Sequence, residues 1–345
     1  VATVPFLQKL YGMPPGLTVR YGSTNALAEF YGEFWSEDDL DAFLDLSGVL
    51  RGRVKAAPWP VYGDLPNNPY FPGLEANLDA QYMAGLSPNA TTSFYSVADR
   101  NPYSYENEGF LAWLFFAGCQ ENPPLVHSLS YADEEWSLFA PAVPNAAEYA
   151  RRMDDEFVKL ALRGVTVIAA SGDDGAAGPR LQVSFGAKST DACESSSPQW
   201  PASSPYVTSV GATTLSNKHH AACSRTYGYN VVCSARSGSL ITSGGGFSNV
   251  YPQPPWQAVA VDAYLANEDV IPTPPGWFNR SGRGYPDVSA YGSMFLIVLR
   301  GRMKRESGTS ASTPVLAAMC TLWNDMRLAH GLPPVGFIAP MLYYT

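Results

Sequence analysis

The feature that most constrains the fold is an amphipathic segment followed at once by a strongly apolar one. Residues 145–163 have the apolar spacing of a long helix, and Gly164 ends that pattern. Residues 165–170 then read Val-Thr-Val-Ile-Ala-Ala, which is too apolar for an exposed strand. A helix followed by a strand buried on both faces is typical of a parallel sheet covered by helices. One face of the helix carries Tyr149, Met153, Phe157 and Leu160.

Similar patterns occur on both sides of this unit. They predict helices at residues 26–34, 37–46, 74–84 and 109–119, and strands at residues 94–97, 125–131 and 207–213. Nothing repeats at a fixed period and no clear linker is visible, so residues 1–345 are expected to form one domain. The predicted fold class is α/β, with a mostly parallel central sheet and helices on both faces.

Composition excludes two classes of partner. The chain has a net charge of −9 and a pI near 4.9, and no basic cluster follows a phosphate backbone, so a nucleic-acid partner is not expected. No apolar run reaches the roughly 18 residues that a membrane span requires. The low share of charged residues, 15%, and the high share of hydrophobic residues, 46%, indicate a globular protein.

Ser310 is the candidate nucleophile. It lies in Gly308-Thr309-Ser310-Ala311-Ser312-Thr313-Pro314, directly before an apolar run with helical spacing that ends near Gly331. A serine at a helix N-terminus acts either as a cap or as a nucleophile whose oxyanion meets backbone N–H groups. Three hydroxyl residues and a glycine exceed what a cap requires.

A serine nucleophile needs a base, and the histidines are poor candidates. His219 and His220 lie in an irregular region, His330 lies at a helix end, and His127 lies inside an apolar strand as a predicted core residue. Carboxylates remain. Glu75 and Asp79, at i and i+4, share one helix face, either as a solvated acidic face or as a buried pair that holds a proton.

A third carboxylate follows the buried strand. Asp173 lies in Ser171-Gly172-Asp173-Asp174-Gly175, at the strand's carboxyl end, where open α/β sheets bind their ligands. A protonated carboxyl group there donates a hydrogen bond to an oxyanion, which requires acid conditions unless burial raises its pKa. Asp174 is the alternative donor.

These segments, in this order, resemble the sedolisin family of serine-carboxyl peptidases, and the resemblance runs from about Tyr11 to Tyr343. It implies a subtilisin-like fold, with Ser310 as nucleophile, Glu75 as general base, Asp79 as its support and Asp173 in the oxyanion hole. Further matching words are Pro201-Ala202-Ser203-Ser204-Pro205-Tyr206-Val207, Ser243-Gly244-Gly245-Gly246-Phe247-Ser248 and Tyr285-Pro286-Asp287-Val288.

The resemblance also suggests substrate contacts. The segment Ser130-Tyr131-Ala132 is similar to a strand that pairs with the substrate backbone, although Ala132 stands where the family usually has glycine. Gly244 and Gly245 lack side chains and either permit close approach of a peptide or form a flexible loop. The family implies a prodomain partner that this chain does not contain. It also implies one Ca²⁺, whose ligands are expected beyond Thr345, so no metal site is expected within the chain.

Two further patterns indicate an oxidising, exported route, to a lysosome, a vacuole or the outside of the cell. Asn89 and Asn279 begin glycosylation sequons. Cys223 and Cys233 flank a segment that a hairpin disulfide would close, and Cys193 has no obvious partner. Cys119 and Cys320 are expected to be buried thiols.

These residues allow three functions to be considered. The first is a peptidase working in acid, which the resemblance favours as one that releases N-terminal tripeptides, with internal cleavage as the alternative. The second is a secreted glycoprotein that uses the fold for binding or structure and is catalytically inactive. A glycoside hydrolase built on Glu75 and Asp79 is disfavoured, because helix neighbours at i and i+4 lie on one surface and do not flank a sugar ring.

Overall fold

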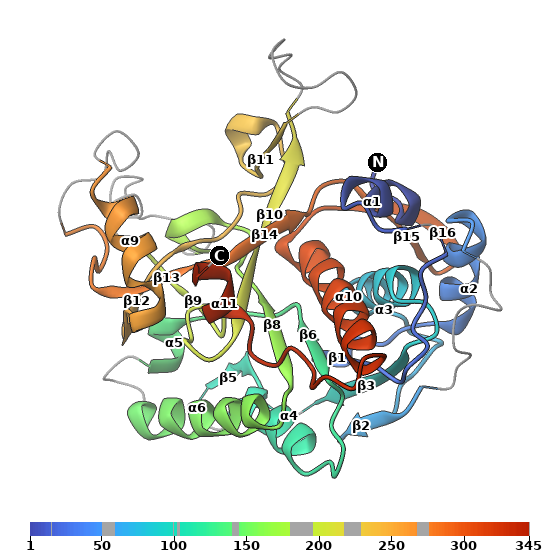
Figure 1. The fold of residues 1–345 in the computed structure, drawn as a ribbon, viewed down its shortest axis with the longest axis horizontal. Coiled ribbons are helices and arrows are strands. Elements are labelled where there is room, and N and C mark those ends of the chain that lie inside the picture. The colour runs from blue at the N-terminus through green and yellow to red at the C-terminus, as the bar shows by residue number, and fades with distance from the viewer. Residues whose placement is uncertain are drawn as a thin grey trace.

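A central eight-stranded sheet organises the protein (Figure 1). All strand pairs in it are parallel except β10–β11. The structure is a computed structural model that describes residues 1–14, 16–49, 59–98, 100–101, 104–139, 145–179, 196–216, 229–267 and 276–344. The strands lie in the order β11 (Asn230–Val232), β10 (Thr208–Leu215), β8 (Thr166–Ala170), β6 (Val126–Leu129), β1 (Thr24–Phe30), β3 (Thr91–Val97) and β2 (Val61–Gly63), and β14 (Val288–Tyr291) pairs with β10.

Helices cover both faces of this sheet (Figure 1). On one face α3 (Leu74–Leu86) packs beside α10 (Thr309–Leu328), and α10 crosses β10, β8 and β6. On the other face α4 (Phe110–Gly118) packs against α6 (Ala146–Leu162). Each face has its own hydrophobic core. The predicted α/β fold with a mostly parallel sheet is therefore confirmed.

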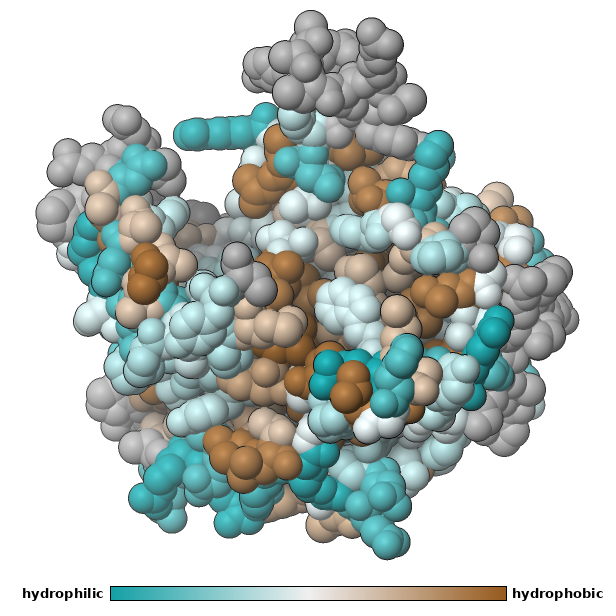
Figure 2. Space-filling view, in the orientation of Figure 1, coloured by the Kyte–Doolittle hydropathy of each residue, from teal (hydrophilic) through white to brown (hydrophobic). Residues whose placement is uncertain are grey.

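The helix α6 shows why the sequence pattern was informative. Tyr149, Met153, Phe157 and Leu160 are buried under the sheet, as their spacing predicts. The opposite side of α6 is hydrophilic, and Figure 2 shows polar side chains gathered along it at the lower edge of the molecule. The following strand β8 is buried along its whole length.

One predicted element was wrong. Residues 26–34 have the composition and spacing of a helix, but Thr24–Phe30 forms β1, which pairs with β3 on one side and with β6 on the other. Its side chains alternate between the two cores, with Leu27 in one core and Ala26, Ala28 and Phe30 in the other. Tertiary pairing has overridden local helix propensity. Glu29 has the same parity as Leu27 and so faces the helices α3 and α10.

The remaining elements surround the sheet and the helices that cover it. The helix α2 (Glu37–Leu46) begins after Ser36, whose hydroxyl accepts the N–H of Asp39. The other helices are α1 (Val4–Leu10), α5 (Glu135–Phe139), α9 (Ala258–Leu265) and α11 (Ala339–Tyr344). The other strand pairs are β4 (Arg100–Asn101) with β5 (Ser104–Glu108), β7 (Asp133–Glu134) with β9 (Gln199–Trp200), β12 (Gly246–Pro252) with β13 (Gly282–Tyr285), and β15 (Phe295–Leu299) with β16 (Arg302–Glu306). None of the described helices has the length and apolarity that crossing a membrane requires.

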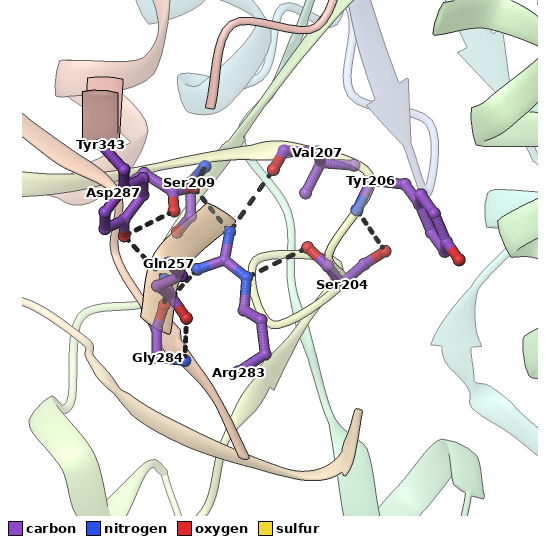
Figure 3. A network of polar contacts seen from close by, with 9 residues as sticks. All are labelled: Ser204, Tyr206, Val207, Ser209, Gln257, Arg283, Gly284, Asp287 and Tyr343. Carbon is purple, nitrogen blue, oxygen red and sulfur yellow. Dashed lines mark hydrogen bonds and ion pairs between the residues drawn. The ribbon is translucent and has the colours of Figure 1, made fainter. Parts of the chain in front are cut away.

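A buried ion pair ties the C-terminal elements to the sheet (Figure 3). The guanidinium of Arg283 lies 2.6 Å from the Asp287 carboxylate, and both side chains are fully buried. Asp287 also accepts the N–H of Ser209 at 2.8 Å and the hydroxyl of Tyr343 at 3.0 Å. Arg283 donates in addition to the carbonyl oxygens of Ser204, Val207 and Gly284.

Candidate active site

Ser310 lies in the first turn of α10, as its sequence context predicts. Its hydroxyl donates to the carbonyl oxygen of Ser130 at 3.2 Å, so Ser310 lies against the end of β6. Pro314 stands four residues later and has no N–H to give to the Ser310 carbonyl. The hydroxyl of Ser130 donates to that carbonyl instead, at 3.3 Å. Two hydrogen bonds therefore link Ser130 and Ser310.

Glu75 and Asp79 form a buried pair on α3 rather than a solvated face. Asp79 is fully buried, and its Oδ2 accepts the Ser130 hydroxyl at 2.8 Å. Glu75 lies near Ser310, whose side chain interacts with its carboxyl group. Ser130 thus contacts both Asp79 and Ser310. These contacts bring Ser310 and the two carboxyl groups into one site.

Burial changes the proton affinity of this pair. Desolvation raises the pKa of Asp79 to about 8, although the hydrogen bond from Ser130 acts in the opposite direction. Desolvation, followed by the charge of Asp79, also raises the pKa of Glu75 well above its usual range, while the Ser310 contact lowers it. The two carboxyl groups therefore hold protons at pH values where exposed acids have lost them.

Asp173 faces the same site from the end of β8. Its Oδ1 accepts the N–H of Thr309 at 2.7 Å and the hydroxyl of Thr309 at 2.9 Å. Burial raises the pKa of Asp173, and the two bonds from Thr309 lower it. A methyl group added at Gly308 would lie 3.0 Å from Oδ2 of Asp173 and 3.5 Å from Cβ of Ser310. Oδ2 and Ser310 therefore both lie next to Gly308, whereas Asp174 pairs through its backbone with Thr242.

Sequence reasoning missed a fourth carboxyl group, Glu29. Its side chain is fully buried at the end of β1, and Oε2 accepts the hydroxyl of Tyr131 at 3.0 Å. Desolvation, followed by the charges of Asp79 and Glu75, raises its pKa well above the usual range. The available signal was a single acid inside an apolar run, but that run was interpreted as a helix.

The expected substrate residues lie around this cluster. Ser130 and Tyr131 contact the carboxyl groups, and Ala132 follows them, half-buried, before β7. A methyl group on Gly244 would lie 2.0 Å from the carbonyl oxygen of Ser171, and one on Gly245 would lie 3.1 Å from Pro286. Close packing within the protein thus explains both glycines.

His127 does not belong to the site. It is fully buried between Tyr95 and Trp113, and desolvation lowers its pKa to about 3, which confirms the prediction of a core histidine. His330 is exposed beyond the end of α10, whereas His219 and His220 lie outside the described residues. No group of three or more His, Cys, Asp or Glu side chains in the described segments is arranged to hold a metal ion.

One of the cysteine expectations needs correction. Cys233 is buried and its backbone pairs with Ala212 and Ser243, while its expected disulfide stays a prediction. Its expected partner Cys223 lies outside the described residues, as does Cys193. Cys320 is a buried thiol as expected, whereas Cys119 is exposed, because it lies at the C-terminal end of α4.

Both sequon asparagines are partly tied to the backbone. Nδ2 of Asn89 donates to Val19 at 2.8 Å, and Nδ2 of Asn279 donates to Ser248 at 2.8 Å. The hydroxyl of Ser281 donates to Oδ1 of Asn279 at 2.8 Å. Glycosylation of either residue stays a prediction.

Comparison with known proteins agrees with this geometry. Residues 73–327 match the subtilase family. Tripeptidyl-peptidase 1 of Canis lupus familiaris is 37% identical over 326 residues, and that of Homo sapiens is 35% identical over 329 residues. The alignments cover 93% of this chain but 52% and 51% of those proteins, so the chain spans about half their length.

Solved structures support the fold. Pseudomonas sedolisin, a serine-carboxyl proteinase complexed with two molecules of pseudo-iodotyrostatin, superposes with a TM-score of 0.66 at 20% identity, covering 99% of this chain and 84% of that one. An epidermin leader peptide processing serine protease from Staphylococcus aureus gives 0.52 at 14% identity, covering 98% and 73%. The family match establishes that the chain belongs to the subtilase family, and the superposition shows that its fold is that of Pseudomonas sedolisin.

Proposed function

We propose that this protein hydrolyses peptide bonds in acid through an acyl-enzyme formed on Ser310. The observation that carries the proposal is that Ser310 lies among carboxyl groups from two other elements, the helix α3 and the end of β8. Glu75 acts as the general base, Asp79 supports it and Asp173 stabilises the oxyanion. The substrates are peptides or unfolded proteins.

In the first half-reaction Oγ of Ser310 bonds to the carbonyl carbon of the substrate and its proton passes to Glu75. The carbonyl oxygen becomes an oxyanion, which protonated Asp173 stabilises by donating a hydrogen bond. The carbon–nitrogen bond then breaks, and the leaving amine takes the proton from Glu75. Water, deprotonated by Glu75, hydrolyses the ester, and the proton returns to Ser310.

The acid dependence follows from mutual repulsion among the carboxyl groups. Close acids lose their protons in separate steps, the first at a lower pH than the last. A single negative charge on Glu75 and Asp79 is enough for the base, while Asp173 must keep its proton. Activity should therefore be bell-shaped in pH and fall as Asp173 ionises.

Release of N-terminal tripeptides is the favoured mode, because the curated relatives carry that name and align over most of this chain. Ser130 and Tyr131 are proposed to pair with the substrate backbone, as are Gly244 and Gly245. An acidic compartment, lysosomal, vacuolar or extracellular, suits such chemistry. We also propose that the protein binds the family's prodomain, and that segments outside this chain hold the family's Ca²⁺.

The test is mass spectrometry of products from a defined peptide between about pH 3 and 7. Ser310→Ala should abolish cleavage, because removing the nucleophile of such sites costs several orders of magnitude. Ser312→Ala is the matched control, since its hydroxyl bonds to the carbonyls of Ala290 and Tyr291 away from the site. Unchanged turnover by Ser310→Ala would refute the proposal, and no turnover by the unaltered protein would favour a binding role.

The same digestion separates the two modes of cleavage. A peptide with a free N-terminus should give a ladder of tripeptides, and its N-acetylated counterpart should be cut slowly. Random internal fragments from both peptides would make the protein an endopeptidase.

A further inference from the structure

The start of the helix α3 has an unusual cap. Its N-cap residue, Gly73, offers no side chain, so the first N–H groups of the helix need a partner from elsewhere. Glu33 supplies it from 42 residues away in the sequence. Its Oε2 accepts the N–H of Glu75 at 3.1 Å and the N–H of Ala76 at 3.4 Å. The capped residue Glu75 is the proposed base.

Gly73 is required for this contact. A methyl group at that position would lie 1.7 Å from Oε2 of Glu33, so only glycine leaves room for the carboxyl group. The N–H of Gly73 donates to the carbonyl oxygen of Phe34 at 2.9 Å, which fixes the two segments to each other. The Glu33 carboxyl group can therefore cap the helix only while residue 73 is glycine.

The turn after β1 brings Glu33 to this place. Tyr31 and Gly32 both have positive φ, 58° and 74°, and the N–H of Glu33 donates to the carbonyl oxygen of Phe30 at 3.1 Å. Two acids from the end of β1, Glu29 and Glu33, thus face α3. Only Glu33 bonds to the helix backbone.

The charge of Glu33 acts on the same site. It raises the pKa of Glu75, after the larger effects of desolvation and of Asp79, and it also raises the pKa of Glu29. The titratable groups around Glu75 are Asp79 on its own helix, Asp173 from the end of β8, Glu29 and Glu33 from the end of β1, and Tyr131 from the segment after β6.

We propose that Glu33 is a positioning residue, which seats the start of α3 so that Glu75 meets Ser310, and which sets the pH range over which that base works. The inference rests on the proposed peptidase function. Glu33 does not touch the reacting atoms; it acts through the backbone and the charge of Glu75.

Glu33→Gln separates the two effects. The amide oxygen still accepts the N–H groups of Glu75 and Ala76, but the negative charge is gone. Glu75 then loses its proton more readily, so the acidic limb of the pH profile of kcat/KM should move to lower pH by at least about half a unit. Glu37→Gln is the control, because it removes an identical charge from an exposed position in the first turn of α2 and should leave the profile unchanged.

Glu33→Ala removes the cap as well as the charge. We expect the pH shift together with a fall in kcat of about 10-fold or more, because small displacements of catalytic groups are costly. Backbone amide exchange at Glu75 and Ala76 should become faster, a readout that does not depend on activity. Gly73→Ala, which displaces the carboxyl group, should reproduce these effects and add little to Glu33→Ala in the double variant.

The outcomes distinguish this inference from the proposed function. Activity that survives Ser310→Ala would refute the peptidase mechanism itself. An active protein in which Glu33→Gln keeps the original pH profile, and Glu33→Ala only lowers the melting temperature, would reduce Glu33 to a structural cap and overturn the inference alone.

Discussion

Two regions of the molecule bury acidic side chains, but only one of them provides a counter-charge and a hydrogen-bond partner for every oxygen. In the network around Arg283, both oxygens of Asp287 are bonded and a guanidinium balances the charge (Figure 3). In the active site, Glu29, Glu75 and Asp79 each keep one buried oxygen without a hydrogen-bond partner among the described residues. The strongest charge effects on Glu29 and Glu75 are repulsive: the charge of Asp79 acts on both, and that of Glu75 acts on Glu29.

The difference lies in how the charge of each region responds to pH. A buried carboxylate with a counter-charge and full hydrogen bonding stays ionised and fixes its neighbours in place. Crowded acids without a counter-charge give up their protons only as the pH rises, so their charge varies with pH. The first arrangement joins α11 and the 201–207 segment to the sheet, and the second makes the surroundings of Ser310 sensitive to pH.

The largest expected effect on stability comes from breaking the compensated network. Arg283→Met leaves Asp287 buried without a counter-charge and should lower the free energy of unfolding by about 3–5 kcal/mol in urea titrations. Lys159→Met is the control, because Lys159 is half-exposed beside Glu156 and surface pairs contribute less than about 1 kcal/mol. Equal losses in the two variants would contradict the contrast drawn between the regions.

The uncompensated acids should make stability depend on pH. The pKa of Asp79 is about 8 in the folded protein, above its ordinary value near 4, so the folded state binds more protons between these values. Stability is then highest below about pH 4 and falls as the pH rises toward 8, by about 1.4 kcal/mol per pH unit for one group. Asp79→Asn should flatten the slope measured between pH 5 and 7. An unchanged slope would show that Asp79 does not titrate in this range.

The smallest effects come from single hydroxyl groups, one in each region. Tyr343→Phe removes a donor to Asp287, and Tyr131→Phe removes a donor to Glu29. Each should cost about 1 kcal/mol in thermal or chemical unfolding. Only Tyr131→Phe should also alter the pH profile of peptide cleavage, because Glu29 belongs to the coupled acids. A change of profile in Tyr343→Phe would indicate that the two regions communicate.

Much of the fold was predictable because its signals are local. The pattern of residues in α6 and β8 predicts a helix followed by a buried strand. The apolar run after Ser310 predicts the helix α10 in the same way. Glu75 and Asp79 were predicted as a pair because i and i+4 positions share a face in any helix. The segment that holds Asp173 was predicted as a ligand site because strand ends in such sheets are where ligands bind, and the family resemblance selected Asp173 rather than Asp174.

The failures have a common physical cause, since they depend on contacts distant in the sequence. β1 has residues that favour a helix, and only pairing with β3 and β6 makes it a strand. Because the sequence predicts a helix there, it does not predict that Glu29 and Glu33 lie beside α3. The cap from Glu33 spans 42 residues and has no local signature apart from Gly73.

The proline in α10 has a further consequence. Because Pro314 leaves the Ser310 carbonyl free, the Ser130 hydroxyl has one hydrogen and two acceptors, that carbonyl and Asp79. Ionised Asp79 attracts the hydrogen at 2.8 Å, whereas protonated Asp79 can itself donate to Ser130 and free that hydrogen for the carbonyl. Because α10 lacks one N–H group at Pro314, the charge on Asp79 in α3 decides which way the Ser130 hydroxyl points.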